Sequence, residues 1–330
     1  MKRHLTVILL LSIIFAACTP ASIPTPTKTP TDTLTPTLTI TPTIIPTTTL
    51  ALIPTGTSTV TLTPTAAPKF VIGSTQKSSI DGMVLLYVPA GDFQMGLSKE
   101  QSQAAIDICV KMGGILPNCR NIYNNNPDHK VYLNAFWIDR TLITNGMYEM
   151  CVKDGGCKVP LKTNSSTHAR YYGNIQYADY PVIYTDWDRA SAYCNWAGRA
   201  LPTEAQWEKA ARGTDGRTFP WGEGISHIRE NYQGQDTTKV GSFPDGASPY
   251  GALDMAGNVW EWVNDWYYSS YYSNSPESNP QGPTSGKYHV LRGGSWINKG
   301  IDTPSAYRIA FDTTYLYAKI GFRCAAQANP

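Results

Sequence analysis

The sequence predicts a loop-rich domain with only a few helices. Ser98 with Gln101 and Thr203 with Gln206 have the spacing of helix capping boxes, in which the two side chains satisfy free backbone groups of the first turn. Glycines follow three periodic segments at positions suited to a helix end: Gly113, Gly198 and Gly213. Most of the remaining sequence is dense in Gly, Pro, Asn, Tyr and Trp, which suits turns and packed aromatic anchors better than long sheets. We therefore expect helices at three places, near 99–112, 186–197 and 204–212.

The first eighteen residues are typical of an export signal. A short basic stretch precedes an apolar run over 5–15, and small residues stand directly before Cys18. The pattern resembles a bacterial lipobox, with Phe15 at a position that is usually aliphatic. We expect a lipoprotein signal peptide over 1–18 and lipidation of Cys18, which places the protein in the cell envelope, outside the cytoplasm. A plain signal peptide with an incidental cysteine is the alternative.

Residues 19–68 form a Thr/Pro-rich, nearly uncharged tract that cannot bury a core. We expect a disordered stalk there, which in polyproline II form would reach roughly 150 Å. We expect a linker over 69–82, one folded domain over 83–326 and a tail over 327–330. The net charge is only +2, which argues against a nucleic acid partner. The membrane is expected to be contacted through the lipid anchor alone.

Six distinctive motifs follow one another along the part of the chain that we expect to fold. They are VPAGDFQMG at 88–96, RALPTEAQWEKAARG at 199–213, FPWG at 219–222, GALDMAGNVWEW at 251–262, RGGSW at 292–296 and GFRC at 321–324. Together they resemble the formylglycine-generating enzyme, or sulfatase-modifying factor, family from about Met83 to Cys324. The resemblance implies an α+β fold related to C-type lectins, loop-rich, with few helices and short antiparallel strands.

The resemblance also implies two copper-binding cysteines just after Gly-Gly-Ser in members that make formylglycine. Here those positions hold Asn298 and Thr303, and no cysteine occurs between Arg292 and Phe322. An amide and a hydroxyl cannot act as thiolates, because copper(I) prefers sulfur and neither group ionises near neutral pH. We therefore expect no copper, and we lean against the oxidase activity and against an enzyme altogether.

Other chemistries have weaker support in the sequence. None of the five histidines forms a His-x-x-x-His pair or a facial triad with a nearby carboxylate, so no iron is expected. Glu204 and Glu208 lie on one face of a predicted helix, and we expect them to be solvated rather than catalytic. Two alternatives to ligand binding stay open: an enzyme of the same family that uses unidentified residues, and a structural envelope protein.

The stretch from 300 to 318 has an unusual composition. It contains no Lys, Glu, Gln, Met or Trp, which are the residues that an asparagine codon cannot become by changes at its adenines. Diversity-generating retroelements mutate adenines, and their targets include lectin-like proteins of this family with a variable region between a Gly-Gly-Ser-Trp block and a Gly-Phe-Arg block. The sequence resembles such a target. An ordinary aromatic-rich loop that happens to lack these residues is the alternative.

This resemblance predicts a recognition surface over 297–318 for an unknown protein, peptide or glycan. Trp260, Ser295 and Trp296 would frame the cleft. The variable positions would be Ile297, Ile301, Asp302, Tyr307, Ile309, Ala310, Phe311, Asp312, Tyr315, Tyr317 and Ala318, whereas Ser305, Ala306, Arg308 and Ile320 would stay constant. Tyrosine gives a large, rigid contact area at a low entropy cost, as in antibody paratopes. Core packing is the rival role for the two tryptophans and for the aromatic residues of the segment.

The resemblance implies a structural calcium site between 254 and 261. Its ligands would be the Asp254 and Glu261 side chains and the main-chain carbonyls of Gly257 and Val259. Calcium takes hard oxygen ligands of this kind. A solvated aspartate and a glutamate hydrogen-bonded to a turn are the alternative.

Seven cysteines divide into one lipidated residue and three pairs. The resemblance implies a disulfide between Cys194 and Cys324, which leaves two local pairs, Cys109 with Cys119 and Cys151 with Cys157. An exported location favours disulfides, and the longest loop would contribute roughly 3–5 kcal/mol in the loop-entropy model. The absence of a Cys-x-x-Cys motif argues against zinc.

Overall fold

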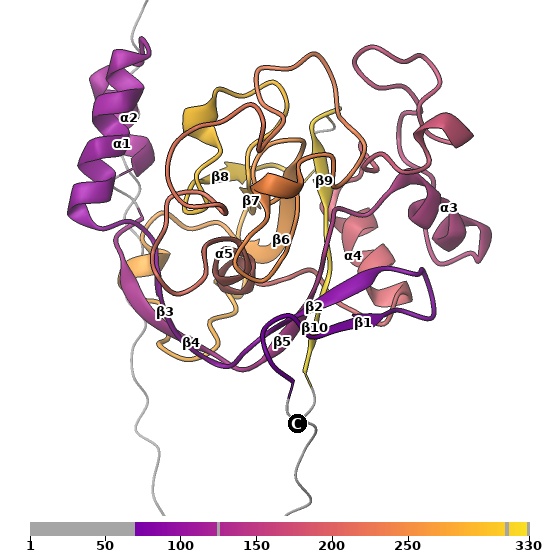
Figure 1. The fold of residues 1–330 in the computed structure, drawn as a ribbon, viewed down its shortest axis with the longest axis horizontal. Helices are drawn as coiled ribbons and strands as arrows, with labels where there is room; N and C mark the ends of the chain where they lie inside the picture. Colours follow the sequence, from indigo (N-terminus) through magenta and orange to yellow (C-terminus); the bar gives the residue numbers. More distant parts are fainter. Residues whose placement is uncertain (1–69, 124–125, 314–316, 329–330) are drawn as a thin grey trace, which may run out of the picture. The chain divides into compact units, whose positions relative to one another are not determined.

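A computed structural model describes residues 70–123, 126–313 and 317–328 (Figure 1). The α-helices in this part of the chain are α1 (Lys99–Lys111), α2 (Leu116–Tyr123), α3 (Asn145–Lys153), α4 (Trp187–Trp196) and α5 (Glu204–Arg212). Single 3-10 turns occur at η1 (Ile175–Tyr177), η2 (Pro244–Gly246), η3 (Tyr271–Ser273) and η4 (Gly300–Asp302). The expected signal peptide, Cys18 and the stalk lie outside the described residues, and so does Tyr315.

The strands are short and form three small sheets. They are β1 (Thr75–Lys77), β2 (Val84–Val88), β3 (Gly91–Met95), β4 (His129–Leu133), β5 (Phe136–Asp139), β6 (Trp260–Trp266), β7 (His289–Arg292), β8 (Arg308–Phe311), β9 (Ile320–Phe322) and β10 (Ala325–Gln327). The sheet orders are β1-β2-β5-β10, β3-β4 and β8-β7-β6-β9. Pairing is antiparallel except between β6 and β9. The predicted α+β fold with few helices and short, mostly antiparallel strands is confirmed.

The three predicted helices are present, and both capping boxes form at the expected residues. The Ser98 hydroxyl accepts from the Gln101 amide nitrogen at 3.2 Å, and the Thr203 hydroxyl accepts from Gln206 at 3.1 Å. Helix α5 ends where Gly213 takes a φ of 70°, which a side-chain-bearing residue adopts only with strain. Figure 1 draws α5 at the centre of the domain, where it packs on β3, β4, β6 and β7.

The linker predicted over 69–82 is wrong, because part of that segment belongs to the fold. Strand β1 pairs with β2, and Asp81 is buried, where its carboxylate accepts hydrogen bonds from the Tyr193 hydroxyl (2.8 Å) and from Arg199. The expected tail also begins too early, since Gln327 pairs with Phe136 in the sheet.

Three disulfides join the described cysteines in the same pairs as expected. The Cα–Cα distances are 6.0 Å for Cys109–Cys119, 5.3 Å for Cys151–Cys157 and 5.6 Å for Cys194–Cys324. The first bond joins α1 to α2, and the last ties α4 to the residue that precedes β10. Within the ranges that the structure describes, no helix has the length and apolar character needed to cross a membrane.

Candidate functional site

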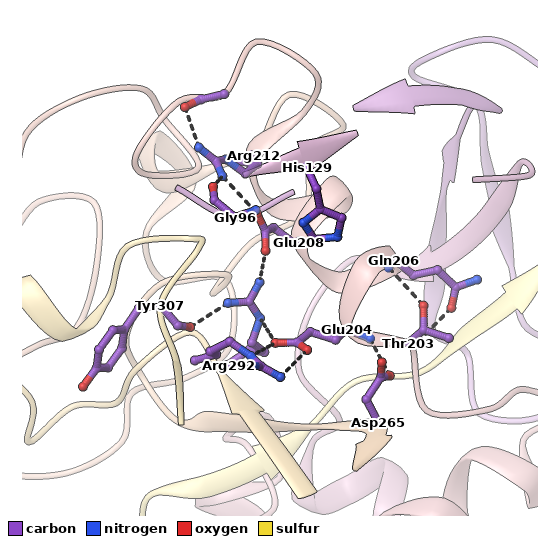
Figure 2. Close-up of polar contacts among 12 residues, drawn as sticks. Gly96, His129, Thr203, Glu204, Gln206, Glu208, Arg212, Asp265, Arg292 and Tyr307 are labelled. Atoms are coloured by element: carbon purple, nitrogen blue, oxygen red, sulfur yellow. Dashed lines mark hydrogen bonds and ion pairs between the residues drawn. The ribbon is translucent and has the colours of Figure 1, made fainter. Parts of the chain in front are cut away.

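The loop over 293–307, which contains the first half of the predicted recognition segment, is held at both flanks by buried arginines that bind α5. Figure 2 labels the first of them, Arg292. At the first flank, Arg292 pairs with Glu208 and also donates from Nη1 to the Tyr307 carbonyl at 2.7 Å. At the second flank, Arg308 forms two hydrogen bonds with Glu204, of 2.6 and 2.9 Å. Because β7 and β8 align Arg292 opposite Arg308, the chain between them is a closed loop on a fixed base.

Glu204 and Glu208 are buried, and each forms an ion pair with an arginine, so the expectation that they are solvated is wrong. Besides binding Arg292, the Glu208 carboxylate accepts from Arg212 at 2.9 Å and from the Gly96 amide at 2.8 Å. Figure 2 shows these contacts converging on α5. Arg292, Arg212 and the Gly96 amide thus all donate to this one buried carboxylate, which ties α5 to its neighbours.

The two positions at which the family resemblance implies cysteines hold residues that are hydrogen-bonded within the loop. The Asn298 side-chain oxygen accepts from Trp260 Nε1 at 2.9 Å and from the Ser295 hydroxyl at 2.6 Å. Thr303 is fully buried, and its hydroxyl donates to the Gly300 carbonyl at 2.9 Å. Both residues therefore stabilise the turn around η4.

A buried carboxyl group lies beside Thr303 that sequence reasoning missed. Glu230 is almost completely buried, and neither of its carboxyl oxygens has a well-formed hydrogen bond within the described ranges. Burial raises the pKa of Glu230 to about 8, and the nearby Thr303 hydroxyl opposes that rise. No sequence pattern marks this residue, because a lone glutamate in a loop resembles any solvated one.

Four of the residues predicted to shape the binding surface belong to the core. Trp260, Ser295, Trp296 and Tyr307 are all buried, and the Tyr307 ring packs 5.8 Å from the ring of Trp260. The prediction that they line an open cleft is therefore wrong, and they lie beneath the surface instead. For Trp260, Trp296 and Tyr307 this is the rival role that the sequence analysis left open. The reason is the dense aromatic packing under this loop, where Tyr307 also lies 5.8 Å from Tyr123.

The other described positions of the segment reach the surface to different degrees. Ile297 is 54% exposed and Tyr317 is 42% exposed. Ala310 is exposed, and partial burial is shared by Ile301, Asp302, Ile309, Phe311, Asp312 and Ala318. In contrast, the positions expected to stay constant, Ser305, Ala306, Arg308 and Ile320, are all buried.

A cavity of about 540 Å³ opens beside the same segment. One wall comes from α1, another from residues 218–225, and the third from Ile301, Pro304 and Tyr307. Its volume lies in the range typical of small-molecule sites. No sequence pattern marks this cavity, because its walls come from three segments that are distant along the chain.

The predicted calcium ligands lie in a buried region that already holds a positive charge, the guanidinium of Arg323. Both Glu261 oxygens accept from Arg323, at 2.7 and 2.9 Å, and Arg323 also donates to the Leu253 carbonyl. The Asp254 carboxylate accepts from the Gly241 amide at 2.7 Å. The donor chemistry at Asp254, Gly257 and Val259 fits calcium, whereas Glu261 would have to be shared with a guanidinium. The described residues contain no group of three or more acidic, cysteine or histidine side chains placed to hold a metal.

Comparison with known proteins assigns the domain to a family. The family description "Sulfatase-modifying factor enzyme 1-like domain" matches residues 69–328. A formylglycine-generating enzyme from Streptomyces coelicolor is 31% identical over 260 residues, covering 62% of this chain and 82% of that protein. A Chlamydia pneumoniae protein named serine/threonine-protein kinase pkn1 is 40% identical over 217 residues, which cover 62% of this chain and 35% of that protein. The chain therefore spans about a third of the length of the Chlamydia relative.

Among solved structures, Treponema denticola variable protein 1 shares the fold, with a TM-score of 0.59 and 21% identity over 77% of this chain and 99% of that one. The family match begins at residue 69, ahead of the start expected at 83, in agreement with the place of β1 in the sheet. The order of motifs, the fold and this match agree, and the chain belongs to the sulfatase-modifying factor enzyme 1-like family.

Proposed function

We propose that this domain binds a protein, peptide or glycan ligand through the surface of residues 297–318, and that it lacks the copper oxidase chemistry of formylglycine-producing relatives. The observation that carries the proposal is the pattern of burial along this segment. The positions expected to stay constant are buried, and most of the described positions expected to vary reach the surface.

This pattern gives the segment two properties that a variable recognition surface needs. Surface substitutions usually change the free energy of unfolding by no more than about 0.5 kcal/mol, so exposed positions such as Ile297 and Ala310 tolerate many side chains. Arg292, just before the segment, and Arg308, within it, bind Glu208 and Glu204 and keep the base of the 293–307 loop in place while its surface changes. Tyrosine, aspartate and threonine at the surface supply contact area and hydrogen bonds.

The Treponema relative supports the proposal at the level of the fold. Its name describes it as a variable protein, and the likeness at 21% identity indicates that the same fold is used there. Diversification of the present chain is therefore a proposal about its gene, and it is tested at the gene.

The test is to sequence the DNA around the gene. We expect a near-copy of the codons for Trp296–Arg323, differing at adenines, beside a reverse-transcriptase gene. Such a template establishes a diversified surface and directs work to ligand capture. A genome without a template returns the segment to an ordinary loop and removes the diversified part of the proposal.

The competing function is the family's oxidase activity, which is favoured by 31% identity to the Streptomyces enzyme over most of that protein. Against it stand Asn298 and Thr303 at the cysteine positions, each committed to hydrogen bonds of the loop. Aerobic incubation of the protein with copper and a Cys-x-Pro-x-Arg peptide is expected to leave the peptide mass unchanged. Conversion of the cysteine thiol to an aldehyde would overturn the binding-only proposal.

We also propose that the chain is exported and anchored in the cell envelope by a lipid on Cys18. Three disulfides in the described residues support an oxidising location, since such bonds are rare in the cytosol. Mass spectrometry of the N-terminal peptide from isolated membranes is expected to find acylated Cys18. The Cys18→Ser variant should then move to the soluble fraction, and its retention in the membrane would contradict the anchor.

A further inference from the structure

The cavity beside the recognition segment has an aromatic and aliphatic interior. Tyr123, Phe219 and Tyr307 are buried at its inner side, and Ile108, Ile225 and Ile301 add aliphatic surface. The Tyr123 hydroxyl donates to the Ile301 carbonyl at 2.9 Å, which fixes the ring against this wall. An interior of this kind takes an apolar group, because burial there removes apolar surface from water on both sides.

The walls are fixed by close packing rather than by the recognition loop alone. A Cβ atom at Gly300 would lie 2.3 Å from Ile225 Cγ2, so the η4 turn is packed directly against the segment that carries Ile225. The wall formed by α1 is held to α2 by the Cys109–Cys119 disulfide. The cavity is therefore largely formed before any ligand enters, which lowers the entropy cost of binding.

The charges at the cavity are of one sign. Glu100 and Glu223 line it, both are exposed, and among the described residues no lysine, arginine or histidine does. The Ser98 hydroxyl donates to Glu100 at 2.8 Å, and the Thr218 amide donates to Glu223 at 2.9 Å. Hydrogen bonds, from its own backbone amide and from Ser98, lower the pKa of Glu100, so this carboxylate is ionised at neutral pH.

Lys99 and Arg217 interact electrostatically with these carboxylates, and neither residue lines the cavity. Lys99 acts on Glu100 from the exposed start of α1. Arg217 interacts electrostatically with Glu223, but its guanidinium is hydrogen-bonded to Asp215 at 2.6 and 2.9 Å. The two lining carboxylates are therefore left to face a ligand.

We propose that this cavity binds a small organic cation, an ammonium group carried on an aromatic or branched apolar body. The apolar body occupies the space against Tyr123, Phe219 and Tyr307, and the ammonium group lies near Glu100 and Glu223 at the mouth. The inference rests on the proposed function in one respect: Ile301, Pro304 and Tyr307 come from the recognition segment, so this segment supplies one wall of the site.

The experiment is isothermal titration calorimetry of the full chain with three matched probes. These are 4-phenylbutylammonium, the neutral 4-phenylbutanol and the anionic 4-phenylbutyrate. We expect the ammonium to bind, the alcohol to bind about five- to tenfold more weakly because exposed charge pairs contribute little each, and the acid not to bind. Equal binding of the ammonium and the alcohol, or no binding of either, would overturn the proposal.

Variants locate the binding in the cavity. Ala104→Trp places a large ring on the α1 wall and should abolish binding, whereas Gln103→Trp, next to it on the helix but outside the cavity, should leave binding unchanged. Equal effects of the two variants would mean that the probe binds elsewhere. If Ala104→Trp does not fold, Glu223→Gln still decides the matter, because it keeps the volume and should weaken the ammonium severalfold while leaving the alcohol unchanged.

Failure of this inference is distinguishable from failure of the proposed function. If the protein binds 4-phenylbutylammonium and the genome holds no template that differs at adenines, the cavity proposal stands and the proposal of a diversified surface fails. A template together with no ammonium binding would do the reverse. The exposed Glu277→Gln serves as the charge control, and it should not change any of the titrations.

Discussion

The Arg292 guanidinium donates to the carbonyl oxygen of Tyr307, fifteen residues further along the chain, at 2.7 Å. The loop over 293–307, which holds the first half of the recognition segment, is thus closed by one buried side chain. Arg292 also binds Glu208 on α5, so one guanidinium both closes the loop and ties it to the central helix. Replacing this arginine removes both contacts at once and leaves a buried carboxylate without part of its compensating charge.

We therefore predict that Arg292→Ala lowers the free energy of unfolding by about 3–5 kcal/mol, the usual effect of breaking a buried pair from one side. Urea unfolding followed by tryptophan fluorescence measures this change. Lys130→Ala is the matched control, because it breaks an exposed pair with Asp92 and should leave the stability nearly unchanged. Equal effects of the two substitutions would show that the buried network is not a main support of the fold.

Trp296 and Ile297 are adjacent at the start of the segment, but truncating their side chains should change the stability by very different amounts. Trp296 is 7% exposed and donates from Nε1 to the Ala318 carbonyl at 3.2 Å, whereas Ile297 is 54% exposed. Trp296→Ala should cost about 3–5 kcal/mol, and Ile297→Ala should change stability by no more than about 0.5 kcal/mol. Thermal unfolding of the two variants separates anchor from surface. A large loss for Ile297→Ala would contradict the tolerance on which a variable surface depends.

Stability should fall as pH rises because of Glu230. Its pKa is raised to about 8 in the fold, from an ordinary value of 4.5, so the folded state holds a proton that the unfolded state has already lost. The stabilising effect of that proton is complete below about pH 4.5 and disappears as pH rises towards 8, by at most about 1.4 kcal/mol for each pH unit. Chemical unfolding at several pH values measures the slope.

Glu230→Gln is the direct comparison, because the amide keeps the shape and cannot ionise. The variant should lose this part of the pH dependence and be more stable than the unmodified chain above pH 8. Parallel curves for the two proteins between pH 5 and 8 would mean that Glu230 titrates normally. The comparison reports on one side chain, since every other titrating group is common to both proteins.

Calcium is expected to raise the unfolding temperature if Asp254, Glu261 and the two carbonyls act as ligands. Scanning calorimetry with calcium and then with a chelator measures the effect, because a ligand that binds only the folded state stabilises it by mass action. Asp254→Asn should remove most of the response. No shift with calcium would leave Glu261 as the partner of Arg323 alone.

Local chemistry in the sequence was sufficient to predict three helices. A capping box acts within four residues, so Ser98 with Gln101 and Thr203 with Gln206 mark the starts of α1 and α5. The segment that became α4 is marked by the glycine that follows it, Gly198. Helices α2 and α3 were missed because each is short and its stability comes from packing and from disulfides at Cys119 and Cys151. Strand β1 was missed for a similar reason, since its three residues are exposed and are held by pairing with β2.

The candidate site was only partly predictable from sequence. The replacement of cysteines by Asn298 and Thr303 is visible in the sequence, because it depends on alignment to motifs nearby. The burial of Tyr307 and Glu230 is not, because it depends on partners far along the chain, such as Tyr123 and Thr303. The cavity was hidden for the same reason: α1 and Ile301 come together only in the folded domain.

Strands β1 and β10, close to the two ends of the described domain, form the opposite edges of one four-stranded sheet. Neither end of the domain therefore passes through the core, which is a favourable arrangement for joining a domain to other segments of chain. A unit built in this way is portable. The Chlamydia relative, in which the matching region makes up 35% of a longer protein, is an example of the same module in a different chain. Gene fusion can thus give this fold new neighbours without redesigning its interior.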